Sequence, residues 1–193
     1  MVDMESEDAP EFKLCNSANG GSYTRLELLA IFRSLRYNES FTSISFRGMD
    51  LGPLHSKFDN LGTDHIAWTS RMGLSITKYF NIAPQDKSLL YQEVQALALK
   101  SNRLQRLDFG YALPKRRPKD TFDIEGDSLE KDPGTEIVAG LLPLCRARLT
   151  NVNWIVLSGI ELGETDLDDI SMYLIRIPSK FYQKLTSHSS CFG

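Results

Sequence analysis

The side chains that most often carry catalysis or bind metals are few in this sequence, and they are scattered. His55, His65 and His188 stand far apart, and none has a cysteine or a carboxylate at a metal-ligand spacing. The acidic pair Asp168-Asp169 falls at the start of a predicted helix, where carboxylates interact favourably with the helix dipole. The sequence has no glycine-rich phosphate loop, nucleophile elbow or dinucleotide fingerprint. It therefore predicts a non-enzymatic protein with no catalytic residue, no metal site and no cofactor.

The cysteines and the apolar segments bear on the compartment. Cys15, Cys145 and Cys191 are odd in number and widely spaced, which indicates reduced thiols rather than a disulfide framework. Cys145 lies in a predicted helix and is expected to be a small buried hydrophobic residue rather than a nucleophile. The N-terminus, MVDMESEDAP, lacks the apolar core of a signal peptide, and no stretch approaches the roughly 18 apolar residues of a membrane span. We expect a cytoplasmic protein with no membrane partner, and a nuclear location is the alternative.

Charge and short motifs give only weak indications of a partner. The net charge of −3 over 193 residues does not direct the molecule toward nucleic acid. A basic run at 115–119 is neutralised by the acidic residues that follow it, so a solvated loop over 114–134 is favoured over a nuclear-import or nucleic-acid patch. His65-Ile66-Ala67-Trp68 is similar to a docking motif for a phosphatase catalytic subunit, but core packing in a hairpin is the favoured interpretation. Nucleic-acid binding is not expected.

One pattern occurs twice and predicts the architecture. Apolar residues occupy positions 1, 4, 6, 9 and 11 of both 41–52 and 152–163, and a glycine follows in each copy. Self-similarity of this kind predicts a repeat fold in which every unit contributes one short strand. The sixth positions of the candidate units are Leu14, Phe46, Ile76, Phe109 and Leu157.

Helices are expected between these strands, on the side that covers the core. Helical spacing of apolar residues predicts them at 22–37, 87–100, 136–145 and 166–174. Asp86 or Ser88 is expected to cap the second helix. Pro143 is expected to end the third one early, because proline removes a backbone donor. A hairpin at 62–76 is expected to replace a regular unit.

The pattern from Phe41 to Gly52, with a less regular copy from Leu104 and a third from Val152 to Leu174, resembles the leucine-rich repeats of the ribonuclease-inhibitor type. The resemblance covers 22–175 and implies an α/β solenoid of about 4–5 irregular strand–turn–helix units. The sequence pattern is also similar to that of fungal repeat proteins that act as phosphatase regulators or cell-wall biogenesis factors. Repeat folds of this type mostly bind other proteins.

The sequence departs from the family at the turns and at its ends. The family places asparagine or cysteine at position 9, whereas this chain has Met49, Ala112 and Ile160, so packing is expected to hold the turns. We expect a partly disordered N-terminal segment at 1–21, a repeat domain at 22–175 with a charged insertion at 114–134, and a tail at 176–193. The tail completes no further strand, and a fragment of a longer repeat protein is therefore a further interpretation.

Alternate residues of each strand should point away from the helices and form a concave binding surface. The residues expected there to bind a protein partner are Arg47, Arg106, Asp108, Trp154 and Val156. Ser43 and Ser45 belong to the same outward set. An exposed tryptophan is typical of an interface hot spot, and packing against a neighbouring strand is the alternative for Trp154.

The leading hypothesis is a scaffold that binds another protein on its concave sheet face. The alternative is a GTPase-activating or phosphatase-regulatory protein, in which Arg47 or Arg71 would supply the functional arginine.

Overall fold

The described part of the chain forms a parallel β-sheet with helices packed on one of its faces. The structure, a computed structural model, describes residues 2–3, 10–16, 21–37, 39–55, 69–70, 73, 75, 87–115, 132 and 134–175. The strands are β1 (Val2–Asp3), β2 (Glu11–Lys13), β3 (Ser43–Ser45), β4 (Arg106–Asp108) and β5 (Trp154–Val156). The helices are α1 (Arg25–Leu35), the short 3-10 helix η1 (Gly52–His55), α3 (Leu89–Lys100), α4 (Ile137–Arg146) and α5 (Glu164–Ile175).

The strands lie in the sheet in chain order, from β1 to β5. β1 pairs antiparallel with β2, and each later pair is parallel. Ile44 of β3 lies between Phe12 of β2 and Leu107 of β4, and Leu107 pairs in turn with Ile155 of β5. The predicted α/β class is therefore confirmed. Because β2 belongs to the sheet, the sheet begins before residue 22, the expected start of the repeat domain.

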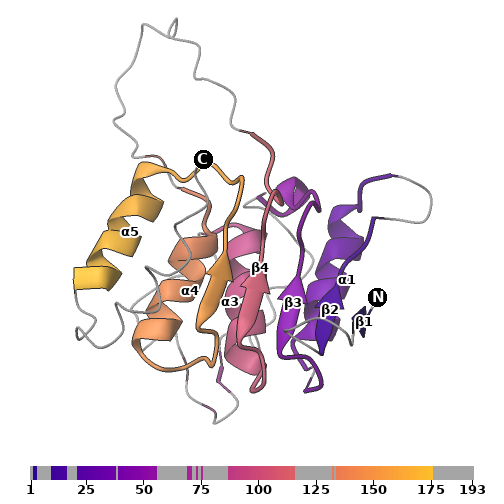
Figure 1. Cartoon of the computed structure of the whole chain (residues 1–193), viewed down its shortest axis with the longest axis horizontal. Coiled ribbons are helices and arrows are strands. Elements are labelled where there is room, and N and C mark those ends of the chain that lie inside the picture. Colours follow the sequence, from indigo (N-terminus) through magenta and orange to yellow (C-terminus); the bar gives the residue numbers. More distant parts are fainter. Residues whose placement is uncertain are drawn as a thin grey trace, which may run out of the picture.

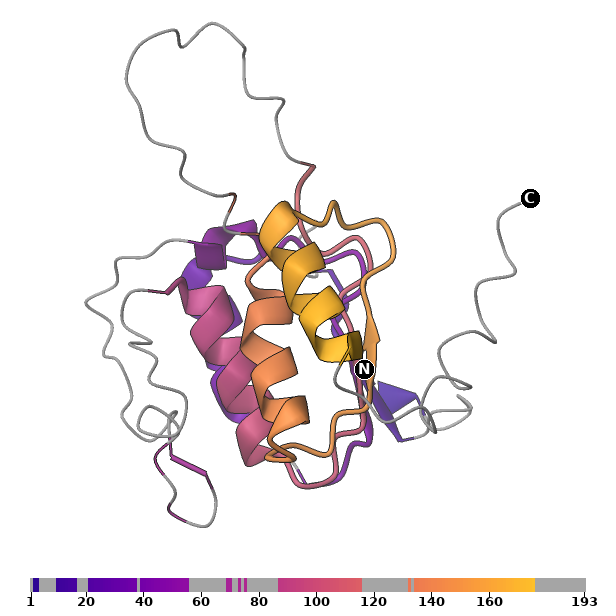
Figure 2. The same cartoon turned by 90° about the vertical axis from the view of Figure 1, so that its left-hand side faces the viewer.

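The four α-helices lie side by side along one face of the sheet (Figure 1). Contacts follow the chain, since α1 packs against α3, α3 against α4 and α4 against α5. Figure 2 shows the sheet nearly edge-on with these helices on the same side, so the described helices leave the other face uncovered. The uncovered face is where the outward-pointing strand residues lie.

Capping residues determine where the first two helices begin. Thr24 and Glu27 form a capping box before α1: the Glu27 N–H donates to the Thr24 hydroxyl, and the Thr24 N–H donates to the Glu27 carboxylate. α1 is therefore shorter than the predicted 22–37. α3 begins after Ser88, one of the two predicted caps, whose hydroxyl accepts a hydrogen bond from the Tyr91 N–H at 3.2 Å.

The path of α4 corrects the expectation that Pro143 ends this helix early. The helix continues past the proline to Arg146, and the Ala147 N–H donates to the Pro143 carbonyl at 3.0 Å. Pro143 removes one backbone donor in the last turn of α4, while the Ala147 N–H that follows still has an acceptor.

Three stacked phenylalanine rings form the centre of the core. The ring centroid of Phe46 lies 4.5 Å from that of Phe32 in α1 and 5.6 Å from that of Phe109, and the rings are close to parallel. All three side chains are fully buried. Phe46 and Phe109 both occupy the sixth position of the pattern, and β3 pairs directly with β4, so the candidate unit of Ile76 places no strand between them. The strand register therefore sets these equivalent side chains side by side. Burial of each ring contributes roughly 1.5–3 kcal/mol to stability.

Repeated backbone hydrogen bonds hold the turns that follow the strands. In three turns the N–H at position 9 donates to the carbonyl at position 6, namely Met49 to Phe46, Ala112 to Phe109 and Ile160 to Leu157. Adjacent turns are joined as well: the Gly48 N–H donates to the Gly110 carbonyl, and the Tyr111 N–H donates to the Ser158 carbonyl, both at 2.8 Å. The expected packing is also present, since Met49 and Ala112 are buried in the core and Ile160 packs against it. The main chain supplies the hydrogen bonds of these turns, since no asparagine side chain is present at position 9 to do so.

α3 is buried along its whole length, including its polar side chains. The apolar side predicted for this helix is buried as expected, with Leu90, Val94, Leu97 and Ala98 in the core. The Glu93 carboxylate binds Arg36 Nη2 at 2.5 Å and Arg33 Nε at 3.3 Å. Because an unpaired buried carboxylate is costly, this pairing makes the burial of Glu93 tolerable.

Asp166 joins the start of α5 to the chain that enters α4. Its buried carboxylate accepts hydrogen bonds from the Thr135 N–H at 2.7 Å, from the Thr135 hydroxyl at 2.9 Å and from the Gly163 N–H at 3.0 Å. Gly134 has a φ of +74°, and a Cβ there would lie 2.7 Å from the carboxylate, so glycine is required at this approach. The chain that follows the predicted insertion is thus fastened to the last described helix.

Several expected features lie largely outside the described residues. Of the hairpin predicted at 62–76, the structure describes an antiparallel bridge between Thr69 and Ser75 and a turn at Gly73. Most of the 114–134 insertion and the whole tail at 176–193 also lie outside them.

Phe46→Ala should lower the free energy of unfolding by about 3–5 kcal/mol, because it leaves a cavity between two stacked rings. Urea denaturation followed by circular dichroism measures the change. Phe41→Ala is the matched control, since Phe41 is only partly buried, and it should cost clearly less. Equal losses at the two positions would contradict the stacked core.

Candidate protein-binding surface

The residues predicted to bind a partner lie together on the uncovered face of the sheet. Strand pairing sets Arg106 beside Trp154 and Asp108 beside Val156. Arg47 follows β3, and its guanidinium reaches Asp108. The surface is accessible, since 46% of the Arg47 side chain and 47% of Trp154 are exposed. The structure thus brings all five residues into one surface.

Part of the outward set is buried, which corrects the expected exposure. Ser43, Ser45 and Asp108 are each less than a twentieth exposed. The serines are short and lie between longer side chains of adjacent strands, and the Ser43 hydroxyl donates to the Glu11 carboxylate at 3.1 Å. The two arginines lie beside the Asp108 carboxylate. The solvent-accessible atoms of this surface are therefore those of Arg47, Arg106 and Trp154 rather than those of Asp108.

Asp108 is the shared counter-ion of the surface. Its Oδ1 accepts a hydrogen bond from the Gly110 N–H at 2.8 Å, which fixes the carboxylate. Its Oδ2 lies 3.6 Å from Arg106 Nη2 and 3.9 Å from Arg47 Nη1. Arg106 also lies 4.0 Å from the Glu11 carboxylate. One buried carboxylate thus holds two guanidinium groups from neighbouring strands.

Each of the two arginines also lies over an aromatic ring. The Arg106 guanidinium carbon is 5.1 Å from the centre of the Trp154 ring, and that of Arg47 is 5.2 Å from the centre of the Tyr111 ring. Guanidinium groups at this distance are attracted to the ring face and gain order from it. We call these five residues, Arg47, Arg106, Asp108, Tyr111 and Trp154, the arginine–aromatic cluster.

Tyr111 is the member of the cluster that sequence reasoning missed. Its φ is +56°, a left-handed conformation that is rare for a bulky residue. Gly48 and Gly159 occupy the equivalent position of the other two turns, with φ of +73° and +69°. A Cβ on Gly159 would lie 2.2 Å from the Tyr111 ring, so the ring rests directly on this glycine. Glycine at two of three equivalent turns was the available signal that the third is left-handed.

The remaining candidate residues do not join the cluster. His55 Nδ1 lies 3.9 Å from Glu136 Oε2, near the start of α4. Arg71, His65 and His188 lie outside the described residues. In the part of the chain that the structure describes, no group of three or more histidine, cysteine, aspartate or glutamate residues could hold a metal ion. Among the same residues, no helix is long and apolar enough to cross a membrane.

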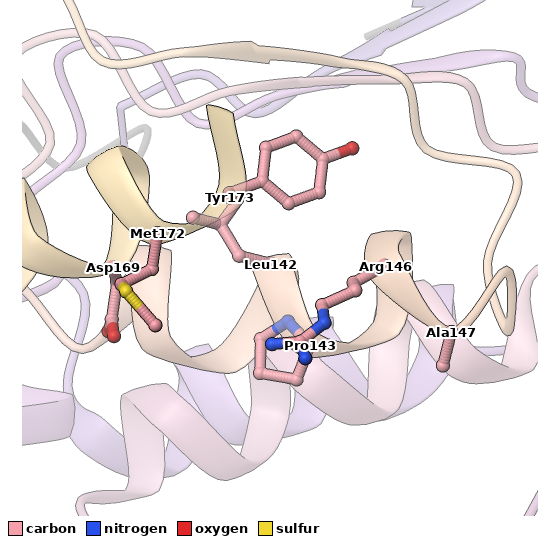
Figure 3. Close-up of a pocket in the computed structure, with 7 residues that line it drawn as sticks. All are labelled: Leu142, Pro143, Arg146, Ala147, Asp169, Met172 and Tyr173. Atoms are coloured by element: carbon pink, nitrogen blue, oxygen red, sulfur yellow. The ribbon is translucent and has the colours of Figure 1, made fainter. Parts of the chain in front are cut away.

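A groove lies between α4 and α5, away from the cluster (Figure 3). It has a volume of about 490 Å³ and is lined by Leu142, Pro143, Arg146, Ala147, Asp169, Met172 and Tyr173. Burial, with a smaller contribution from the charge of Cys145, raises the pKa of Tyr173. The groove holds one basic and one acidic side chain, and neither lies over an aromatic ring as in the cluster.

Cys145 is only partly buried, whereas the sequence predicts a buried hydrophobic residue. Burial raises the pKa of its thiol to about 11, and the thiol donates to the Val152 carbonyl at 3.5 Å. Cys15, in contrast, is exposed. Since the thiolate is the nucleophile, a thiol with this pKa is unsuited to catalysis near neutral pH.

Comparison of the chain with protein-family models, with curated proteins and with solved structures found no match.

Two substitutions of Tyr111 test the left-handed turn. Both Tyr111→Asn and Tyr111→Val remove the ring, but asparagine tolerates a left-handed backbone and the β-branched valine does not. The valine variant should be less stable than the asparagine variant by about 1–2 kcal/mol, measured by urea denaturation. Equal stability of the two variants would show that the turn is not left-handed at this residue.

Thiol reactivity tests the environment of Cys145. In a Cys191→Ser background, Cys15 should react quickly with a disulfide reagent at mildly alkaline pH. Cys145 should react much more slowly in the native protein, because its raised pKa keeps it protonated and its side chain is partly buried. Reaction of both thiols at the same rate in the native protein would contradict this assignment.

Proposed function

We propose that this chain is a leucine-rich-repeat-type solenoid that binds a protein partner on its uncovered sheet face. The observation that carries the proposal is the arginine–aromatic cluster: two exposed aromatic rings, each beneath an arginine, around one buried carboxylate. The partner would dock across β3, β4 and β5 and contact Arg47, Arg106 and Trp154, with Val156 at its edge. No catalytic step is assigned to the surface.

Regular spacing supports the repeat part of the proposal. β3, β4 and β5 pair without offset between equivalent positions of the sequence pattern. The same backbone bond closes the turn after each strand, and the same turn position has a positive φ in all three. Units that share pairing, turn and handedness are what a stacked repeat requires.

The residue types at this surface, and the fixed positions of its aromatic rings, support the protein-binding part of the proposal. Tryptophan, tyrosine and arginine are the residues most enriched at the energetic centres of protein interfaces. Here 47% of Trp154 and 59% of Tyr111 remain exposed. The contacts with the arginines hold both rings in place before a partner arrives, which reduces the entropy lost on binding.

Arg47 is one of the two arginines that the GTPase-activating alternative would use, and the other, Arg71, lies outside the described residues. The Arg47 guanidinium lies beside the Asp108 carboxylate, and Glu11 is bound to the same network through Arg106. These two carboxylates neutralise Arg47 and Arg106, so the network has no net positive charge with which to hold the several negative charges of nucleotide phosphates. Protein docking is therefore the better supported function.

Selection from a library of random peptides displayed on phage tests the proposal without a known partner. Peptides enriched on the immobilised protein would be synthesised, and their dissociation constants would be measured by fluorescence polarisation. Trp154→Ala should weaken binding by about 30-fold or more, the effect of losing a hot spot of about 2 kcal/mol.

Met172→Ala is the matched control. Met172 is 50% exposed, close to the value for Trp154, but it lies on α5. This variant should bind the enriched peptides as the unaltered protein does, and both variants should melt near its melting temperature. Failure to enrich any peptide would overturn the proposed surface. So would enriched peptides that bind Trp154→Ala as tightly as the unaltered protein.

A further inference from the structure

Arg47 presents guanidinium hydrogen-bond donors that the described residues do not use. The Asp108 carboxylate lies 3.9 Å from Arg47 Nη1, beyond hydrogen-bond distance. Among the described residues, no group accepts a hydrogen bond from the Arg47 guanidinium, although the backbone N–H of Arg47 donates to the Ser45 hydroxyl. A guanidinium carries five N–H donors in a planar fork that matches a carboxylate. These donors are therefore available to an incoming acceptor.

The guanidinium is held in place for this role. One side of it lies over the Tyr111 ring, which rests on Gly159. Gly110 lies close to it, and a Cβ at Gly110 would come within 3.0 Å of Arg47 Nη1. The absence of a side chain at Gly110 thus makes room for the arginine. An ordered guanidinium loses less entropy when it binds than a free one does.

We infer that Arg47 binds the carboxylate of an aspartate or glutamate in an extended segment of the partner, while an apolar side chain of that segment packs on Trp154. This inference rests on the proposed function and names the chemistry of the partner. Arginine and carboxylate form two parallel hydrogen bonds, and these are stronger than bonds between neutral groups.

The charge of the surface favours a carboxylate over a phosphate. Arg47 and Arg106 carry two positive charges, and Asp108 and Glu11 carry two negative ones in the same network. The network is neutral, so it accepts one further negative charge at lower cost than two. A phosphorylated side chain carries nearly two negative charges. It would come as close to Asp108 as a carboxylate does, so Asp108 would repel it more strongly.

The positions of Arg47 and Trp154 set the spacing within the partner segment. The two residues are four pattern positions apart along the strand direction and two strands apart across the sheet. At about 3.3 Å per residue and 4.8 Å per strand, their Cα atoms are separated by about 16 Å. An extended peptide covers that distance in about five residues. The acidic and apolar residues of the partner should therefore be about five positions apart.

The enriched peptides provide the test. They should share an acidic residue about five positions from an aromatic or large aliphatic residue. Arg47→Gln should weaken their binding by about tenfold to a hundredfold, the effect of losing a charged hydrogen-bonded pair. Arg103→Gln is the matched control, because Arg103 is exposed in the turn before β4, and it should leave binding unchanged. A peptide with lysine in place of its acidic residue should bind Arg47→Glu more tightly than it binds the unaltered protein.

The outcomes separate this inference from the proposed function. Peptides that depend on Trp154 but lack a shared acidic residue, or that bind Arg47→Gln normally, would overturn the role of Arg47 and leave the binding surface intact. Synthetic copies of the enriched peptides with phosphoserine in place of the acidic residue should bind more weakly, and tighter binding by them would overturn the choice of carboxylate. Peptides whose binding changes with neither the Arg47 nor the Trp154 substitution would overturn both the inference and the proposed surface.

Discussion

The structure depends on the alignment of β3, β4 and β5, which pair so that equivalent positions of the sequence pattern lie side by side. Side chains in a strand alternate between two faces, and a slip of one residue would exchange the two sets. The observed register places Ile44, Leu107 and Ile155 toward the helices. The same register brings the Phe46 and Phe109 rings into contact, since their centroids lie 5.6 Å apart. The buried core and the exposed surface therefore both follow from the register of these three strands.

The outward side of this alignment produces the arginine–aromatic cluster. Because β4 lies between β3 and β5, Asp108 can hold an arginine from its own strand and one that follows β3. The turn after β4 also depends on this strand alignment. The bond from the Tyr111 N–H to the Ser158 carbonyl fixes the turn in which Tyr111 becomes left-handed, and this places its ring under Arg47. A feature of the backbone thus orders a side chain on the neighbouring unit.

Local patterns in the sequence predicted the elements that depend on local physics. The alternation around Ile44 and Ile155 predicted the strands and their inward faces, and the hydroxyl of Ser88 predicted the start of α3. The burial of Asp108 could not be predicted in this way, because it depends on side chains from two other units. The extension of α4 beyond Pro143 depends on the position of the proline in the final turn, which only the observed helix boundary shows. Tyr111 was missed because its conformation follows from alignment with Gly48 and Gly159.

Nuclear magnetic resonance tests the central claim that the arginine–aromatic cluster is the binding surface. The chain has two tryptophans, so a Trp68→Phe variant leaves the indole N–H of Trp154 as a single, assigned signal. Addition of an enriched peptide should shift this signal and the side-chain signals of Arg47, while the amides of α5 stay unchanged. A Trp154 signal that does not move while amides of α4 and α5 shift would contradict the account and place binding at the groove between those helices.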